Sequence, residues 1–337
     1  MKRSFGLDLI RSIAVLFVII VHVFLNTGFY GNRMDNNIIN LFLFLRNLSF
    51  VCVPLFLLLT GYCKRKKQVD KNHYQSIIRI LLVYLIISFL CIPFRIFHLK
   101  DSNLLDLLLG IFRFQTNYYS WYVEMYIGLF LLIPFFNILY QNIPDKRKKQ
   151  LLILILGLLT VCPATLKDIN SSINIFPSWW IMLYPILYYY IGSYIGEYQP
   201  KIKKNYLTMI ILGSLFLQTM INIIQSRNGK PMVSDYYQNL FTMMISTSIF
   251  LFCYQKEIKS EKGKKLFQMI SENSLGIYLF SYIYDSLFYK MIQFPYTINQ
   301  NLILSILIIV PIVFLCSFLS SMIVNKIINI ILKKRNS

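Results

Sequence analysis

Apolar residues in this chain come in long, nearly uninterrupted runs that are separated by short polar connections. A helix of about 20 apolar residues is long enough to cross the hydrocarbon core of a bilayer, where a helix satisfies its own backbone hydrogen bonds. The pattern therefore predicts an all-α, polytopic membrane protein with ten spanning helices. The predicted spans are residues 7–28, 38–63, 75–98, 119–140, 150–166, 177–198, 205–226, 236–255, 271–294 and 300–332.

One further apolar segment, residues 103–116, lies between the third and fourth predicted spans. It is too short to cross a bilayer, so we expect an interfacial or re-entrant helix there. Because every connection is short, the pattern leaves no room for a separate soluble domain. We therefore expect one integral-membrane domain over residues 1–337.

Basic residues are concentrated on alternate connections. Of the 34 Lys and Arg residues, 22 lie on one set of connections and seven on the opposite set. Cytoplasmic connections of membrane proteins carry the excess of positive charge, so both termini are expected in the cytoplasm. The basic set comprises residues 2–3, 64–71, 146–149, 201–204, 256–265 and 333–335.

Composition supports the same class of protein. Hydrophobic residues make up 56% of the chain and charged residues 14%, which excludes an ordinary soluble protein. The formal net charge of +20 follows from the membrane topology, so no nucleic-acid partner is expected. The six cysteines lie in apolar runs without paired spacing, which indicates neither a disulfide framework nor a metal site. The bias to Ile, Asn and Lys is typical of an AT-rich bacterial genome, and we expect the protein in a bacterial plasma membrane.

The first predicted span carries two ionisable residues, Arg11 and His22. Eleven residues turn a helix by roughly three turns plus about 20°, so the two side chains share one face about 16 Å apart. Ionisable groups inside a bilayer usually face a protein interior or a water-filled cavity, which favours a functional pair. The alternative is that Arg11 extends to the headgroups and His22 bonds a neighbouring helix.

Other buried ionisable residues extend this pair into two layers. By residue count, Arg79 lies at nearly the same inner depth as Arg11, whereas Arg46 and Glu124 lie toward the outer side with His22. Guanidinium groups suit phosphate, and a histidine beside a carboxylate suits general-base catalysis. A purely structural ion pair between Arg46 and Glu124 is an equally good interpretation.

Two aromatic residues, Trp121 and Tyr122, flank Glu124 just inside the fourth span. They are candidates for a sugar-binding surface, and membership of an interfacial aromatic belt explains them as well. Asp285 shares a helix face with Tyr278 and Ser281. We expect it to bond another helix or to lie near Lys290.

Six segments together resemble the membrane-bound acyltransferase-3 family, bacterial O-acyltransferases that modify cell-surface polysaccharides and related glycans. These segments are LDLIRSIAVLFVIIVH with its Arg11–His22 pair, VPLFLLLTGY with the later SIIRILLVYLI, SWYVEMYIGLFLLIP, YYYIGSYIG and SLGIYLFSYIYD. Two positions depart from the family's pattern. Ser76 stands where a further arginine is frequent, and Ser281 stands where a histidine is common.

The resemblance implies an acyl-CoA-dependent O-acyltransferase. Acetyl-CoA would enter from the cytoplasm with its phosphates on Arg11 and Arg79, and His22 would act as the general base. Glu124 would orient His22, and Arg46 or a tyrosine would stabilise the oxyanion. Trp121 and Tyr122 would contact the acceptor. No metal is implied.

The resemblance also implies the acceptor, a surface polysaccharide or lipid-linked glycan outside the membrane. Direct transfer and a covalent relay both stay open, as do the acyl group, the acceptor sugar and a homo-oligomeric state. Apart from glycan, the expected partner is membrane lipid. The alternative from another class is an exporter or flippase for a polysaccharide or its lipid-linked precursor.

Overall fold

The structure is a computed structural model that describes residues 4–32, 34–101, 103–170, 175–228, 237–291 and 297–336. All regular secondary structure in these ranges is helical, which confirms the predicted all-α class. The basic residues Lys2, Arg3, Arg33 and Lys230, which entered the charge comparison, lie outside the described residues. The chain divides into two compact units, which are described separately below.

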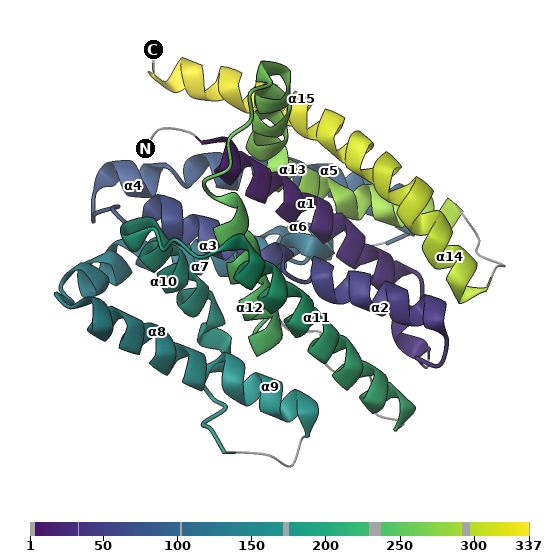
Figure 1. Cartoon of the computed structure of the whole chain (residues 1–337). Helices are drawn as coiled ribbons and strands as arrows, with labels where there is room; N and C mark the ends of the chain where they lie inside the picture. Colours follow the sequence, from purple (N-terminus) through teal and green to yellow (C-terminus); the bar gives the residue numbers. More distant parts are fainter. Residues whose placement is uncertain are drawn as a thin grey trace. The chain divides into compact units, whose positions relative to one another are not determined.

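The first unit comprises Met1–Lys67 and Ile133–Gln268. Its most extensive helix pair is α3 with α10, and α1 packs against α2, α3 and α12 (Figure 1). The unit also contains the second part of α7 and the start of α13, two helices that pass from one unit into the other. Its helices are α1 (Phe5–Asn26), α2 (Asn37–Ser49), α3 (Cys52–Lys64), α7 (Trp121–Gln141), α8 (Lys146–Leu159), α9 (Val161–Ile169), α10 (Tyr184–Tyr198), α11 (Lys204–Arg227), α12 (Leu240–Cys253) and α13 (Glu261–Met291).

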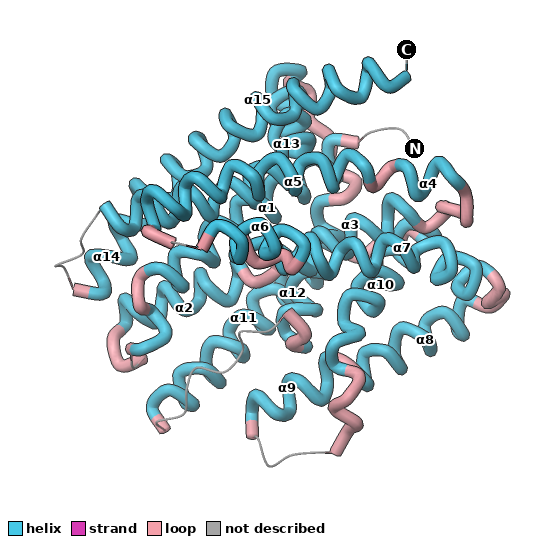
Figure 2. Tube along the Cα trace, turned by 180° about the vertical axis from the view of Figure 1, so that it is seen from behind, coloured by secondary structure: helices cyan, strands magenta, loops and turns pink. Residues whose placement is uncertain are grey.

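The second unit comprises Gln68–Leu132 and Met269–Ser337. Here α5 packs against both α6 and α15, as seen from behind in Figure 2. Two π-helical turns, Arg95–Leu99 and Ser305–Ile309, extend the long helices of this unit. Its own helices are α4 (Lys71–Gln75), α5 (Ile78–Phe94), α6 (Leu104–Phe112), α14 (Ile298–Leu304) and α15 (Val310–Asn336).

Within the described ranges, seven helical stretches are long and apolar enough to cross a membrane, so the chain is a multi-pass membrane protein. Each coincides with a predicted span. The other three predicted spans are also helical, but α10 and α12 have only 15 and 14 residues, and no stretch of α13 meets the same standard. Ten crossings therefore stay a prediction. The seven stretches are Phe5–Asn26, Asn37–Lys64, Lys71–Leu99, Tyr118–Gln141, Lys146–Ile169, Lys204–Arg227 and Ile298–Lys333.

The apolar segment at 103–116 folds as the short helix α6. Its nine residues extend about 14 Å, which is too short to cross a bilayer. Arg95 holds the connections on both sides of α6, because it pairs with Asp101 at 2.6 Å and donates to the carbonyl of Thr116 at 3.2 Å. The short helix is confirmed, and its interfacial position stays a prediction.

Close backbone contact joins α3 and α10. A Cβ added at Gly61 would lie 1.9 Å from the carbonyl oxygen of Tyr189, and one at Gly192 would lie 2.1 Å from that of Leu58. Membrane helices lack a strong hydrophobic force between them, so small residues that allow close van der Waals packing are used at their interfaces. The two glycines therefore set the separation of this helix pair.

The imidazole of His73 caps a main-chain carbonyl of α7 that the helix cannot satisfy in the usual way. Pro134 has no N–H, so the carbonyl of Phe130, four residues earlier, lacks its ordinary helical donor. The Nε2 atom of His73 lies 3.0 Å from that oxygen, and the imidazole stacks on the Phe130 ring at 4.2 Å. Because a carbonyl only accepts, Nε2 carries the proton. This buried histidine has a structural role.

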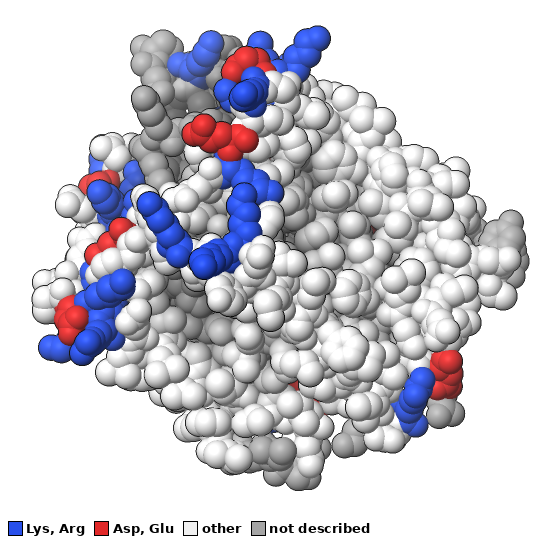
Figure 3. All heavy atoms as spheres, viewed as in Figure 1, with Lys and Arg blue, Asp and Glu red and all other residues white. Residues whose placement is uncertain are grey.

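Within the first unit, one basic connection lies at the end of α3, and others lie at the start of α8, the start of α11 and the end of α12. Figure 3 shows Lys and Arg gathered over these helix ends, whereas the length of the helices presents an uncharged surface. This separation of charge from apolar length is typical of helices that end at a membrane boundary.

Candidate functional site

Arg11 and His22 lie in the same uninterrupted helix, α1. The eleven-residue separation therefore corresponds to a rise of about 16 Å along one face. His22 is only 6% exposed within the described structure, and its carbonyl accepts a hydrogen bond from Asn26 Nδ2 at 2.8 Å. The imidazole is thus enclosed by protein.

Arg11 has a neighbouring carboxylate that the sequence analysis did not weigh. Asp8 lies three residues earlier on the same face, and its Oδ1 is 4.0 Å from Arg11 Nη1. The Asp8 side chain is 7% exposed, while that of Arg11 is 31% exposed. The spacing of three residues in a helix was the signal for this pair. The guanidinium remains accessible to a further anion.

Arg46 is a buried component of a polar network that joins α2 to α11. Its guanidinium carbon lies 4.0 Å from the centroid of the Phe50 ring, and Nε donates to Tyr30 Oη at 3.3 Å. Nη1 donates to Asn47 Oδ1 at 3.2 Å. With 1% of its surface exposed, Arg46 is held in one orientation by these contacts.

Asn47 connects Arg46 to α11. Its Nδ2 donates to Thr219 Oγ1 at 3.2 Å, and its Oδ1 accepts from Asn222 Nδ2 at 3.3 Å. Sequence reasoning missed the α11 residues, although they follow a helical period. The buried polar positions of α11 are Ser214, Gln218, Thr219, Asn222, Gln225 and Ser226. We call Arg46, Asn47, Thr219 and Asn222 the polar network.

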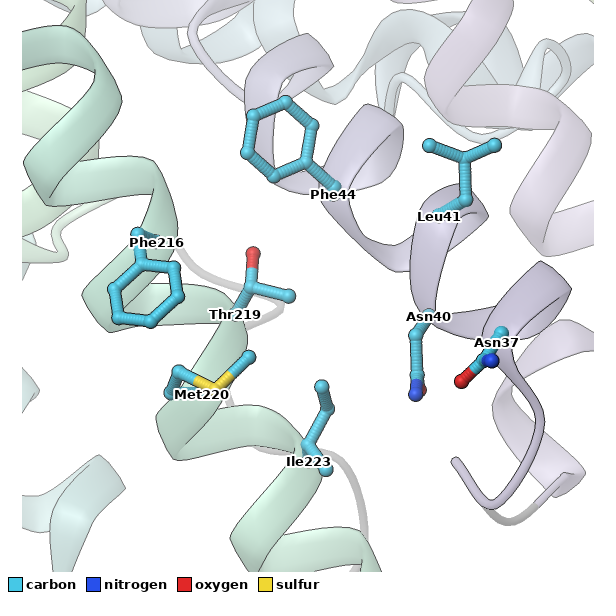
Figure 4. A pocket seen from close by; sticks show the side chains of 8 residues that line it. All are labelled: Asn37, Asn40, Leu41, Phe44, Phe216, Thr219, Met220 and Ile223. Carbon is cyan, nitrogen blue, oxygen red and sulfur yellow. The ribbon is translucent and has the colours of Figure 1, made fainter.

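A groove of about 430 Å³ opens beside the polar network, between α2 and α11. Figure 4 shows the amides of Asn37 and Asn40 near one end and the rings of Phe44 and Phe216 farther along. Thr219 belongs to both the groove and the polar network. An apolar chain in this groove would therefore contact Thr219. The hydroxyl of Thr219 is hydrogen-bonded to Asn47, which in turn accepts a hydrogen bond from Arg46.

In the second unit, Arg79 is exposed at the start of α5. Its Nη1 donates to Asn329 Oδ1 and its Nη2 to Asn325 Oδ1, both at 3.1 Å. Amide oxygens carry no formal charge, so they orient the guanidinium without neutralising it. Arg79 is thus held in a position in which it can bind an anion.

The other predicted residues of the second unit lie in the first turn of α7. Glu124 is exposed, Trp121 is 37% exposed, and their neighbour Tyr122 is half-buried. The Trp121 ring meets Tyr122 edge-on at 6.1 Å, and Tyr122 stacks with Tyr126 at 6.0 Å. These three rings form an aromatic surface, and the helical period places Glu124 nearer to the face of Trp121 than to the face of Tyr122 and Tyr126.

Asp285 of α13 accepts a hydrogen bond from Tyr119 Oη at 3.0 Å, which confirms the expected bond to another element. Lys290 instead donates to the carbonyl oxygen of His98 at 2.9 Å. In the described part of the chain, no three His, Cys, Asp or Glu side chains are grouped as metal ligands would be.

The predicted site residues are distributed over both units. Arg11, His22 and Arg46 belong to the first, and the helices that carry them, α1 and α2, pack together. Arg79, Glu124, Trp121 and Tyr122 belong to the second unit. The predicted pairs Arg11–Arg79, His22–Glu124 and Arg46–Glu124 each combine one residue from each unit, so all three stay predictions.

The apolar helices define a multi-pass membrane protein. Its spanning helices carry enclosed ionisable side chains and a buried polar network. The model of the acyltransferase-3 family, described as an acyltransferase domain, matches residues 4–322, nearly the whole chain. The chain belongs to this family and is a membrane acyltransferase. No curated protein and no solved structure matches the chain.

Proposed function

We propose that the protein transfers an acetyl group from cytoplasmic acetyl-CoA to a hydroxyl group of a surface polysaccharide or lipid-linked glycan on the other side of a bacterial plasma membrane. The observation that carries this proposal is the pair Arg11 and His22. One helix presents a partly accessible guanidinium and, about 16 Å farther along the same face, an enclosed imidazole. Donor and acceptor would approach from opposite sides of the membrane.

The donor would be held by its phosphates. Arg11 and Arg79 supply guanidinium groups, which bind phosphate oxygens and stay charged. The thin pantetheine arm would then extend along the bundle interior toward His22, over the rise that separates Arg11 from His22.

The transfer itself needs a base near the thioester. His22 would accept the proton of the glycan hydroxyl while the oxygen attacks the thioester carbonyl, and Glu124 would orient the imidazole. The tetrahedral intermediate would collapse with cleavage of the C–S bond, and the imidazolium would return the proton to the departing thiolate. Arg46 would stabilise the oxyanion. Direct transfer of this kind requires no nucleophilic residue.

The acceptor would be recognised on the outer side. Trp121 and Tyr122 offer aromatic faces on which a sugar ring can stack. The groove between α2 and α11 supports a lipid-linked acceptor, because its apolar walls can hold a lipid chain next to the polar network around Arg46.

Binding and consumption of acetyl-CoA distinguish an acyltransferase of this kind from an exporter. We expect the purified chain in lipid nanodiscs to bind radiolabelled acetyl-CoA and to release free CoA when a membrane fraction rich in surface glycans is added. Label should appear in the glycan. An exporter would move glycan across the bilayer without binding acetyl-CoA, and that result would overturn the proposal.

Replacing Arg79 by Gln tests the donor site. Loss of a charge-assisted contact to phosphate is worth about 1.5–3 kcal/mol, so KM for acetyl-CoA should rise about 10- to 100-fold. Because phosphate binding is remote from the reacting carbonyl, kcat should change little. The matched control is Arg113→Gln at the exposed end of α6, which should leave KM unchanged. If Arg79→Gln and Arg113→Gln have the same KM for acetyl-CoA, Arg79 does not bind the donor.

A further inference from the structure

A second crevice in the first unit opens among α8, α10, α11 and α12, and the proposed reaction does not use it. Its volume is about 520 Å³. Most of its lining is apolar, and the wall on α12 extends from Met243 to Leu251, about 12 Å along the helix. Leu207 and Ile210 of α11 provide another wall. The shape and chemistry suit a hydrocarbon chain.

Positive charge is concentrated at one end of this crevice. Lys201 and Lys203 flank Ile202, which lines the crevice, and both lysines are exposed. Lys204 begins α11 three residues before Leu207, and Lys256 follows the end of α12. All four belong to a connection set that the sequence assigns to the cytoplasm.

Two of these lysines converge on one ring. The Nζ atoms of Lys204 and Lys256 lie 5.9 and 4.3 Å from the centroid of Phe252, the neighbour of Leu251 in the crevice wall. In the described part of the chain, none of the four lysines pairs with a carboxylate within 4 Å. By contrast, Lys149 nearby pairs with Glu197 at 2.8 Å. The crevice thus combines apolar walls with uncompensated positive charge at its end.

We propose that this crevice binds one anionic phospholipid of the cytoplasmic leaflet. Its phosphate lies among Lys203, Lys204 and Lys256, and an acyl chain lies against Leu207 and Met244. Basic side chains at the cytoplasmic leaflet attract anionic lipid headgroups, and an acyl chain gains from contact with apolar walls. A soluble phosphate compound would leave those walls without a partner, so the combination favours a lipid.

The experiment is a native mass-spectrometric titration of the purified full-length chain with dioleoyl phosphatidylglycerol or dioleoyl phosphatidylcholine. We expect phosphatidylglycerol to bind at least tenfold more tightly. The triple variant K203Q/K204Q/K256Q should lose that preference. The control K262Q/K264Q/K265Q removes the same charge from the exposed start of α13 and should keep the preference within twofold.

A second variant tests the crevice itself. Ser248→Phe places a ring among the lining residues and should weaken binding of both lipids, because the chain and the ring compete for the same space. Circular dichroism and size-exclusion profiles like those of the parent chain establish folding. Equal affinity for the two lipids, or equal effects of the two triple variants, would overturn the proposal. Displacement of phosphatidylglycerol by acetyl-CoA would also overturn it, because the crevice would then be a soluble-phosphate site.

Discussion

Replacing His22 by Ala is expected to abolish acyl transfer to glycan while leaving the membrane fold intact. A general base contributes about 10²- to 10⁴-fold to rate, and no second histidine is available at the position where the family usually carries one, because Ser281 occupies it. Transfer of radiolabelled acetyl from acetyl-CoA to glycan is the measurement. Binding of acetyl-CoA should persist, since the proposed donor site places the phosphates on Arg11 and Arg79 and not on His22.

The control for this variant is His98→Ala, which removes an imidazole that stacks on Phe94 in the second unit. Its transfer rate should stay within a few-fold of the parent rate. If correctly folded His22→Ala protein acetylates glycan at more than one tenth of the parent rate, His22 is not the base.

Replacing Gly192 by Ala is expected to destabilise the first unit by about 3 kcal/mol or more. The new methyl group would lie 2.1 Å from the carbonyl oxygen of Leu58, a backbone atom that moves only if α3 and α10 separate. Loss of their close contact weakens the most extensive helix pair of the unit. Unfolding of the purified protein in mixed detergent, followed by far-ultraviolet circular dichroism, measures the change.

Gly213→Ala in α11 is the matched control, because in the described structure no heavy atom beyond the neighbouring backbone of α11 itself lies within 4 Å of the added methyl group. Alanine lowers the conformational freedom of the unfolded chain, so this variant should gain up to about 1 kcal/mol. Equal stabilities of the Gly192→Ala and Gly213→Ala proteins would mean that α3 and α10 do not approach as closely as their backbones indicate.

The local features of the site could be predicted because they depend on one helix. The 3.6-residue period of a helix is enough to place Arg11 and His22 on one face of α1. The burial of His22 agrees with the free-energy cost of exposing an imidazole to lipid. The same period could have shown Asp8 beside Arg11 and the polar face of α11. Both signals are present in the sequence, as a carboxylate three residues before Arg11 and as polar side chains that recur at helical spacing along α11.

The partners of each residue could not be predicted in this way. Nothing near Arg46 in the sequence indicates Thr219 or Asn222, which lie more than 170 positions later and reach it through Asn47. The two asparagines that orient Arg79 are likewise about 250 residues away. Such contacts depend on which helices pack together. The sequence does not indicate this, because the apolar surfaces of different helices have similar residues.

The sequence by itself determined the class of this protein: a chain of apolar helices with basic residues concentrated on alternate connections, and a family signature that begins with Arg11 and His22. Hydrocarbon length and charge asymmetry act on each segment separately, so a linear pattern records them. Only the tertiary structure decided that Gly61 and Gly192 bring α3 and α10 into backbone contact, that Arg46 belongs to a network with α11, and that a lysine-rimmed crevice opens beside α12. These features arise from packing between distant segments, where the fit of surfaces determines which side chains meet.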